Sequence, residues 1–308
     1  MKQIFLLFGL GLLGLSGCQP SQSAPALPTP EPIPQAFADY WFQGTAELTS
    51  FRLEQVRYGE PREGLATTIY VKEDFSRSRY VKLDYPEQAG DDAVPVLKFN
   101  LNKRFTTGIY DYTLMQSSFT PIQRQTYPNS LRVTTSNIEW CGAFLTNTRL
   151  TEEGYRVDYQ SYFDGEEDLS LTLPKVWLED EIWNVIRINP ELLPLGTVRM
   201  VPSILTEELT HHPLALAEAT ATLEQHDNLS VYTLDYPTLP RLLAITFESA
   251  FPHRLVRWEE TFETVAGWGM EPQVMTTRAE RIRYTMLDYW ERKYLKDEVL
   301  RMTELGIE

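Results

Sequence analysis

The sequence predicts a mainly β protein, built as one large curved antiparallel sheet or half-open barrel with a few short helices; a β-sandwich is the alternative. Three observations support this fold class. Apolar and polar residues alternate along many short segments, as they do in half-buried strands. Aromatic residues form 12% of the 308 residues and only 16 residues are glycine, which is typical of a folded chain. Helical spacing occurs in only a few short stretches.

The N-terminus has the form of a secretory signal. Lys2 supplies a charged start, and an apolar core runs from Ile4 to Leu15. About twelve residues of helix span roughly 18 Å, which is too short for a hydrocarbon layer about 30 Å thick. We therefore expect residues 1–17 to be a cleaved signal peptide and not a transmembrane helix.

The residues that close this segment, Leu15-Ser16-Gly17-Cys18, resemble the lipobox of bacterial lipoproteins. The resemblance implies a thioether-linked diacylglycerol on Cys18, cleavage before it and acylation of the new amine. Two or three acyl chains, at ~0.8 kcal/mol per buried methylene, hold a protein firmly on a bilayer. We expect an exported protein anchored through Cys18 to a bacterial membrane, the outer membrane, and facing the periplasm. An ordinary signal peptide with a chance cysteine is the alternative.

A proline-rich tether is predicted over residues 18–37. Its composition favours extended polyproline II geometry, which reaches about 50 Å at ~3.1 Å per residue. The tether would hold a β-rich domain, residues 38–308, away from the membrane; a ligand for a proline-recognising partner is the alternative. Its prolines are Pro20, Pro25, Pro28, Pro30, Pro32 and Pro34.

Charge and cysteine content restrict the partners. The formal net charge is -15, and removal of Lys2 with the signal peptide makes the mature chain more acidic still. Such a surface repels phosphate backbones and anionic headgroups, so we expect no nucleic-acid partner and an anchor made by acyl chains alone. If Cys18 is lipidated, Cys141 is the remaining cysteine and no intramolecular disulfide can form.

The first half of the domain predicts a long antiparallel hairpin. Residues alternate from Gly44 to Gly59, with a phase slip near Ser50 where we expect a bend, and alternate again over 65–71. We place the turn at 60–64, which contains Pro and Gly. Unbroken alternation over 155–160 predicts a half-buried strand whose two tyrosines point inward. Further strands are expected at 80–84, 94–101, 105–114 and 131–139.

The second half combines helices and strands. Leu178, Ile182 and Ile186 recur at every fourth residue, which predicts a short amphipathic helix over 178–187. Asp297 as N-cap and Gly306 as a stop predict a short C-terminal helix. A proline-bearing connection is expected over 190–213, and strands near 219 and at 231–236, 242–247, 254–262 and 274–286. Because the features of 217–260 follow the order seen in 44–84, the halves 38–187 and 214–287 are candidates for an internal duplication.

Eight short motifs, spread over most of the mature chain, resemble a family of uncharacterised bacterial lipoproteins. That family has no assigned activity, so the resemblance implies membership without a mechanism. The motifs are Gly44-Thr-Ala-Glu-Leu-Thr-Ser-Phe, Arg57-Tyr-Gly-Glu-Pro-Arg-Glu-Gly, Glu73-Asp-Phe, Val96-Leu-Lys-Phe-Asn, Thr107-Gly-Ile-Tyr, Glu139-Trp-Cys-Gly, Ser161-Tyr-Phe-Asp-Gly-Glu and Phe251-Pro-His.

Some members of that family carry the label septum formation inhibitor Maf. The label belongs to a cytoplasmic nucleotide pyrophosphatase, which resembles a compact α/β protein opening with a Ser-x-Ser-x-Arg-Arg loop. This sequence contains no such loop. An exported, acidic, β-rich chain has neither the residues nor the compartment of that enzyme, so we do not transfer its activity.

Two local stretches are candidate sites. Trp140 and Cys141 follow Glu139, but a neighbouring carboxylate raises a thiol's pKa, so we interpret Cys141 as packed and inert in preference to a nucleophile. Asp164 and Glu166 belong to an acidic cluster that lacks the register of a dedicated calcium loop and is interpreted as a solvated hairpin tip. We predict no cofactor and no metal site, because the four histidines lack ligand spacing.

These observations lead to a binding or accessory function. The leading hypothesis is an envelope lipoprotein that carries an apolar envelope molecule, or engages a protein partner, in the concavity of a curved sheet. Its rival is an envelope hydrolase that acts on glycan or lipid through paired carboxylates. A purely structural interaction protein is the third alternative. The absence of a Gly-x-Ser-x-Gly elbow, a phosphate-binding glycine loop and a Cys-x-x-Cys motif makes an enzyme the less favoured class.

Overall fold

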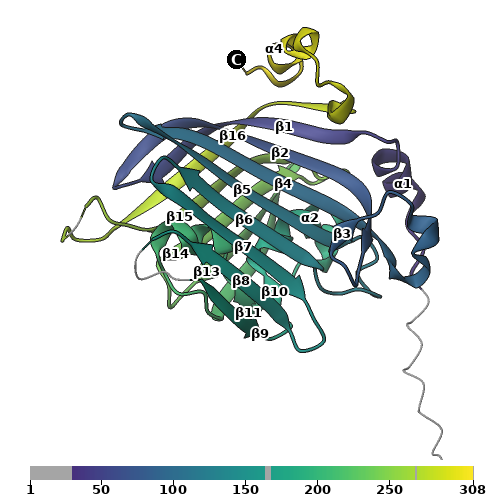
Figure 1. Ribbon diagram of the computed structural model, residues 1–308, viewed down its shortest axis with the longest axis horizontal. Helices are drawn as coiled ribbons and strands as arrows, with labels where there is room; N and C mark the ends of the chain where they lie inside the picture. The colour runs from purple at the N-terminus through teal and green to yellow at the C-terminus, as the bar shows by residue number, and fades with distance from the viewer. Residues whose placement is uncertain (1–29, 164–167, 268, 308) are drawn as a thin grey trace, which may run out of the picture.

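A computed structural model describes residues 30–163, 168–267 and 269–307 of the chain. Within these residues one sheet of 16 strands forms almost the whole body, which confirms the predicted fold class (Figure 1). Its neighbours run in the order β10-β11-β12-β13-β14-β15-β16-β1-β2-β4-β5-β6-β7-β8-β9, with β3 beside β2. All these pairs are antiparallel except β10 with β11.

The strands are long near the middle of the sheet and short at its two edges. In the first half they are β1 (Ala46–Arg57), β2 (Glu60–Ser76), β3 (Val81–Lys82), β4 (Ala93–Thr107), β5 (Tyr110–Pro121), β6 (Arg132–Glu139), β7 (Gly142–Leu150), β8 (Tyr155–Ser161) and β9 (Leu169–Leu173). In the second half they are β10 (Trp177–Leu178), β11 (Gly196–Val201), β12 (Ala217–His226), β13 (Leu229–Tyr236), β14 (Arg241–Glu248), β15 (Leu255–Thr264) and β16 (Gln273–Leu287). The helices are α1 (Gln35–Trp41), α2 (Glu179–Ile188), α3 (Ile204–Thr210) and α4 (Val299–Leu305).

The sheet curls into a half-open barrel. Figure 1 shows β2 and β4–β9 as one wall in front of a second wall made by β11–β15. Pairing of β1 with β16 joins the two walls, from Ala46 opposite Leu287 to Glu54 opposite Arg278. Among the described residues no ladder joins β9 to β10 or β11, so the barrel remains open along this seam. The two edges meet there through side chains, which include Val157, Leu178 and Val201.

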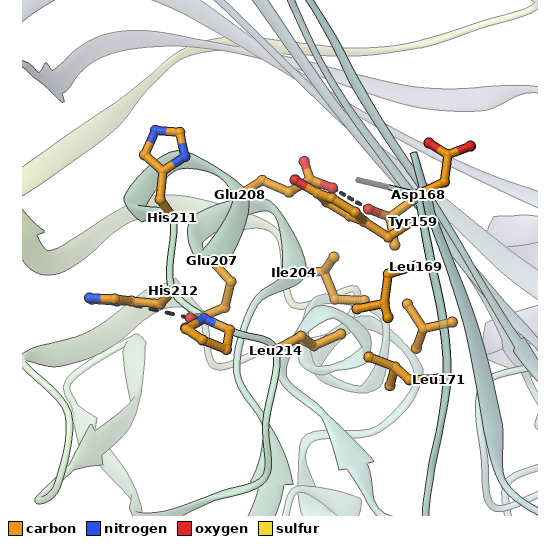
Figure 2. A pocket seen from close by; sticks show the side chains of 13 residues that line it. Tyr159, Asp168, Leu169, Leu171, Ile204, Glu207, Glu208, His211, His212 and Leu214 are labelled. Atoms are coloured by element: carbon orange, nitrogen blue, oxygen red, sulfur yellow. Dashed lines mark hydrogen bonds and ion pairs between the residues drawn. The ribbon is translucent and has the colours of Figure 1, made fainter. Parts of the chain in front are cut away.

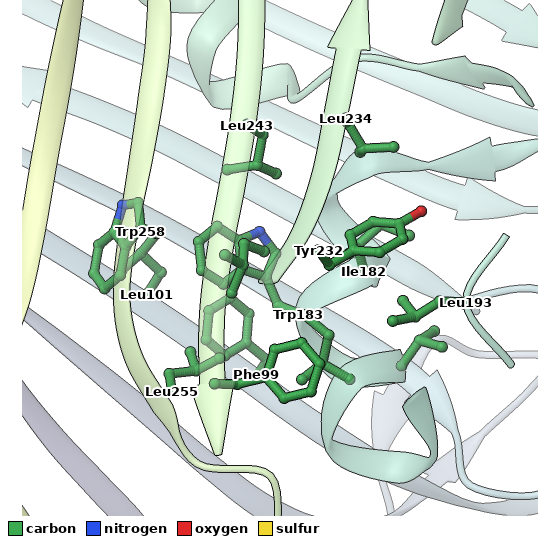
Figure 3. Close-up of a cluster of buried hydrophobic side chains, with 14 of the residues drawn as sticks. Phe99, Leu101, Ile182, Trp183, Leu193, Tyr232, Leu234, Leu243, Leu255 and Trp258 are labelled. Carbon is green, nitrogen blue, oxygen red and sulfur yellow. The ribbon is translucent and has the colours of Figure 1, made fainter. Parts of the chain in front are cut away.

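Helix α2 lies inside the half-barrel, between its two walls. Nine of its ten residues are buried. Trp183 of α2 stacks on Phe99 of β4, and Figure 3 shows Ile182 of α2 beside Tyr232 of β13. The helix predicted over 178–187 is therefore confirmed, but its polar face does not meet water, because charged side chains of the walls pair with it.

Two hairpin turns, β1–β2 and β4–β5, lie at other residues than the sequence pattern predicts. The β1–β2 turn is Tyr58-Gly59, both with positive φ (55° and 70°), and the predicted turn at 60–64 is part of β2. Two residues with positive φ form a turn whose twist matches that of the strands, so the tight turn is preferred over a longer loop. The strand predicted over 105–114 likewise contains the β4–β5 turn at Gly108. The phase slip at Ser50 is confirmed as a register shift between Ser50 and Phe51.

The folded body begins earlier than the predicted boundary at residue 38. The Glu31 carboxylate accepts hydrogen bonds from the Gln125 backbone N–H (2.8 Å) and the Thr126 hydroxyl (2.8 Å). Helix α1 follows at once and buries Phe37 and Trp41. The end of the predicted tether is thus docked on the body, while the signal peptide, Cys18 and the earlier tether lie outside the described residues.

Two further predictions concern the second half. The connection expected over 190–213 contains an edge strand, β11, and helix α3. The stretch 217–260 holds β12–β14 and part of β15, whereas 44–84 holds the two long strands β1 and β2 and the two-residue β3. The two stretches therefore do not match element by element. Helix α4 ends at Gly306 with φ of 65°, as the glycine stop predicts.

Candidate functional site

A cavity of about 400 Å³ lies at the open seam, between α3 and the edge formed by β7–β9 (Figure 2). Most of the residues that line it are apolar or carboxylic. They are Thr146, Val157, Tyr159, Asp168, Leu169, Leu171, Ile204, Glu207, Glu208, His211, His212, Pro213 and Leu214. Its position follows from the topology, because a closed barrel would fill this gap with a strand pair.

Two prolines confine α3 to the seam. Pro202 separates it from β11, and Pro213 prevents its continuation. The helix ends at His211, whose φ of 58° is left-handed, so the chain leaves α3 towards Leu214. Leu205 and Leu209 hold α3 against the front wall by packing with Leu114 and its neighbours. A helix of only seven residues between prolines shows no clear period, so the sequence pattern does not reveal it.

The floor of the cavity is apolar. Val157, Leu169 and Leu171 come from β8 and β9, on one side of the seam. Ile204 of α3 and Leu214 approach from the other side, and Figure 2 shows them facing the leucines of β9. The period-two pattern of β8 supplies this floor, because Tyr155 and Val157 are buried as predicted. Tyr159 is only half-buried and lines the cavity.

Glu207 brings a carboxylate to this floor. The residue is only 8% exposed, and no described residue lies within hydrogen-bond distance of its carboxylate as a donor. The His212 ring lies nearby, with its Nδ1 4.0 Å from Oε2 of Glu207. Burial raises the pKa of Glu207 to about 7, Arg241 opposes the rise and Glu179 adds to it. Glu207 therefore gains or loses its proton near neutral pH.

Glu208, the next residue, is held differently. Its Oε1 accepts the hydroxyl of Thr135 at 2.5 Å and that of Thr146. These threonines lie on β6 and β7, so Glu208 ties α3 to the front wall. Figure 2 shows the two side chains leaving α3 in different directions, with Glu207 turned towards His212 and Glu208 towards Tyr159.

The acidic residues of α2 are mostly paired with arginines. Glu179 accepts from Arg241 Nε at 2.9 Å and from the Tyr236 hydroxyl at 2.7 Å. Glu181 accepts from Arg124 at 3.1 Å. At the other end of α2, both terminal nitrogens of Arg187 donate to Glu47 of β1 at 2.7 Å. These pairs bind α2 to three different strands or loops.

Asp180 is the exception in α2. It is 1% exposed, and its Oδ2 accepts the backbone N–H of Ile204 at 3.2 Å, whereas Oδ1 accepts nothing in the described structure. Burial, and then the charge of Glu179, raise the pKa of Asp180 to about 7. Asp180 thus links α2 to the start of α3 through one hydrogen bond, and its burial disfavours the charged form of the carboxyl group.

Of the candidate site residues singled out from the sequence, Trp140 and Cys141 do not line the seam cavity. Trp140 and Cys141 form the exposed turn of the β6–β7 hairpin, with Trp140 69% exposed, so the interpretation of Cys141 as packed was wrong. The expected effect of Glu139 is present, since its hydrogen bond raises the pKa of the Cys141 thiol. Asp164 and Glu166 lie outside the described residues.

Other predicted features are distributed over the molecule. His211 and His212 line the cavity, while His226 and His253 lie elsewhere. In the described ranges no group of three or more His, Cys, Asp or Glu is arranged to hold a metal ion. Trp41, Trp183 and Trp258 are core residues and do not form a lined cup. No helix within the described part of the chain is long and apolar enough to cross a membrane.

Comparison with known proteins adds little to this geometry. No protein-family model and no curated protein matches the chain. One solved structure, a β-barrel-like protein of a domain of unknown function (DUF1849) from Brucella abortus, aligns with a TM-score of 0.44 and 6% identity. The alignment covers 79% of this chain and 98% of that protein. At this level of similarity the function must be argued from the site itself.

Proposed function

We propose that the half-barrel is a binding or carrier module that accommodates an apolar molecule in the seam cavity. The observation that carries this proposal is the apolar floor, which β8–β9 provide on one side of the seam and α3 with Leu214 on the other. The cavity volume of about 400 Å³ falls in the range of small-molecule sites. Between the two walls, α2 and the apolar side chains packed against it occupy the middle of the half-barrel.

The second part of the proposal is the location: an exported lipoprotein, anchored through acyl chains on Cys18 to the periplasmic face of the outer membrane. Its support is the lipobox-like sequence and the apolar segment before it. The docking of Glu31 on the body shortens the free tether.

A hydrolase with paired carboxylates is less well supported. Glu207 and Glu208 are consecutive residues whose side chains diverge, and Glu208 is held by two threonines. Glycosidase chemistry needs two carboxyl groups that face each other across a cleft. The described lining of the cavity offers no such arrangement around Glu207, so we favour binding.

Photolabelling with an alkyl diazirine tests the proposed function. The full lipidated chain is reconstituted in lipid nanodiscs and illuminated with the probe, and labelled residues are located by mass spectrometry. We expect labelling of the β9 and α3 peptides, with a clear decrease in Leu171→Gln. The matched control is Leu145→Gln, because Leu145 is 46% exposed and does not line the cavity. Unlabelled β9 and α3 peptides, or equal labelling in both variants, would contradict the proposal.

A further inference from the structure

The seam cavity has a polar end as well as an apolar floor. Ile204 and Glu207 are three residues apart on α3 and therefore lie on the same side of the helix. The apolar floor begins at Ile204, and the carboxylate of Glu207 lies one turn further along, beside His212. A molecule that covers both must have an apolar body and one polar group at its end.

The Glu207 carboxylate lines the cavity without a hydrogen-bond donor from the described part of the protein, and this indicates what that polar group is. When a ligand displaces water from such a carboxylate, the desolvation cost is compensated only if the ligand supplies a hydrogen-bond donor. No described residue donates a hydrogen bond to the Glu207 carboxylate, and burial is the main cause of its raised pKa. A ligand N–H or ammonium group would supply the missing donor, and charge-assisted hydrogen bonds of this kind are about twice as strong as neutral ones.

The remaining lining of the cavity favours a cation over an anion. Its charged residues are the acids Asp168, Glu207 and Glu208, and the described lining includes no Lys or Arg. The nearby Arg241 is already engaged by Glu179 through two of its nitrogens. A fatty-acid carboxylate would therefore meet like charges, whereas an amine would meet an acidic site on an acidic protein.

We infer that the seam cavity binds an amphiphile with an amine headgroup, whose alkyl part contacts Ile204, Leu169 and Leu171 and whose N–H groups donate to Glu207. This inference rests on the proposed function and specifies its ligand class. The amine can belong to a free alkylamine or to an aminolipid headgroup. The two differ by a phosphate beside the amine, and the acidic lining favours the form without it.

Competition against the diazirine label distinguishes a free alkylamine from an aminolipid and both from a ligand without an amine. The same nanodisc preparation is titrated with dodecylamine or dodecanol, and in parallel with lysophosphatidylethanolamine or lysophosphatidylcholine, which lacks N–H groups. We expect dodecylamine to protect the β9 and α3 peptides at a concentration lower than that of dodecanol by about tenfold or more. A preference for lysophosphatidylethanolamine over lysophosphatidylcholine would instead identify an aminolipid as the source, and would equally support the amine.

Variants assign the preference to one carboxylate. In Glu207→Gln we expect the advantage of dodecylamine over dodecanol to fall to about threefold or less, with the alkyl labelling retained. In Glu208→Gln the advantage should persist, because that side chain is occupied by Thr135 and Thr146. Three outcomes would contradict an amine headgroup but not the binding of an apolar molecule in the cavity. They are equal protection by amines and their controls, stronger protection by dodecanoate, and an unchanged preference in Glu207→Gln. Absence of alkyl labelling would overturn the proposed function itself.

Discussion

Helices α2 and α3 both carry consecutive acids into the interior of the half-barrel, but they treat them differently. In α2, Glu179 and Glu181 each meet an arginine from another part of the chain. In α3, the Glu207 carboxylate lines a cavity, and within the described residues its ionisable neighbour is the His212 ring at 4.0 Å. Buried charged groups can therefore have two roles. A carboxylate paired with an arginine holds its helix in place, whereas a carboxylate without a donor is available to accept a hydrogen bond from a ligand.

The comparison also explains why the lumen is partly polar. Arg187 and Glu47 form a bidentate pair in which both side chains are at most 1% exposed. Arg187 also stacks over Trp41 and Tyr70, so one side chain links α1, β1, β2 and α2. A buried pair of this kind adds little net stability, but losing one partner is costly. We infer that the paired acids of α2 select one position for the helix among several that its apolar face would allow.

The largest expected loss of stability therefore comes from breaking the buried pair of Arg187 with Glu47. Arg187→Met leaves Glu47 charged and buried, and should lower the free energy of unfolding by about 3–5 kcal/mol. Urea denaturation followed by tryptophan fluorescence measures the loss. The control is Arg278→Met, whose pairs with Glu54 and Glu259 are solvent-exposed and should contribute about 1 kcal/mol or less. Similar losses in both variants would show that burial of the pair does not matter.

A somewhat smaller effect is expected at Asp180, the unpaired acid of α2. Its pKa rises from 3.8 in the unfolded chain to about 7, so the folded state holds the proton more tightly and stability falls as pH rises between these values. Asp180→Asn cannot lose that proton and should gain about 2–4 kcal/mol relative to the wild type near pH 8. Near pH 4 the two proteins should unfold at similar urea concentrations. A wild-type stability that does not change with pH in this interval would contradict the assignment.

Glu207 should respond in the same direction but less strongly, because the cavity admits water. Its pKa is raised from 4.5 to about 7, so Glu207→Gln should gain about 1–2 kcal/mol near pH 8 and nothing near pH 4.5. The matched variant Glu181→Gln removes the charged partner of Arg124 and should be destabilised at both pH values. Denaturant midpoints of the two variants therefore change in opposite directions near pH 8. Destabilisation by Glu207→Gln would mean that this carboxylate also has a structural partner.

The smallest effect is expected at the exposed β6–β7 turn. Cys141→Ser should change the free energy of unfolding by less than about 0.5 kcal/mol, as is usual for a surface position. Since a hydrogen bond to Glu139 raises the pKa of the Cys141 thiol, Glu139→Gln should speed the reaction of Cys141 with iodoacetamide near pH 7.5. The alkylation rate is measured by mass spectrometry of the intact chain. An unchanged rate would show that the carboxylate does not control the thiol.

Local signals in the sequence were reliable where one periodicity dominated. The phase slip at Ser50, the helix over 178–187 and the helix stop at Gly306 all appear in the structure. Turns were less well predicted, because Tyr58 adopts a conformation that its residue type does not signal. The candidate site was missed because its side chains come from β8, β9, α3 and the chain after α3, none of which carries a recognisable motif.

Composition and period-two alternation by themselves determined that this chain forms a curved, strand-rich body, since each strand encodes its own buried face. They could not determine which acids are paired. Glu179 and Glu207 are both glutamates in short helices, and only the tertiary structure places Arg241 against the first and leaves the second without a donor. The reason is physical: the pKa and the role of a buried carboxylate depend on the groups packed around it, and these come from distant strands.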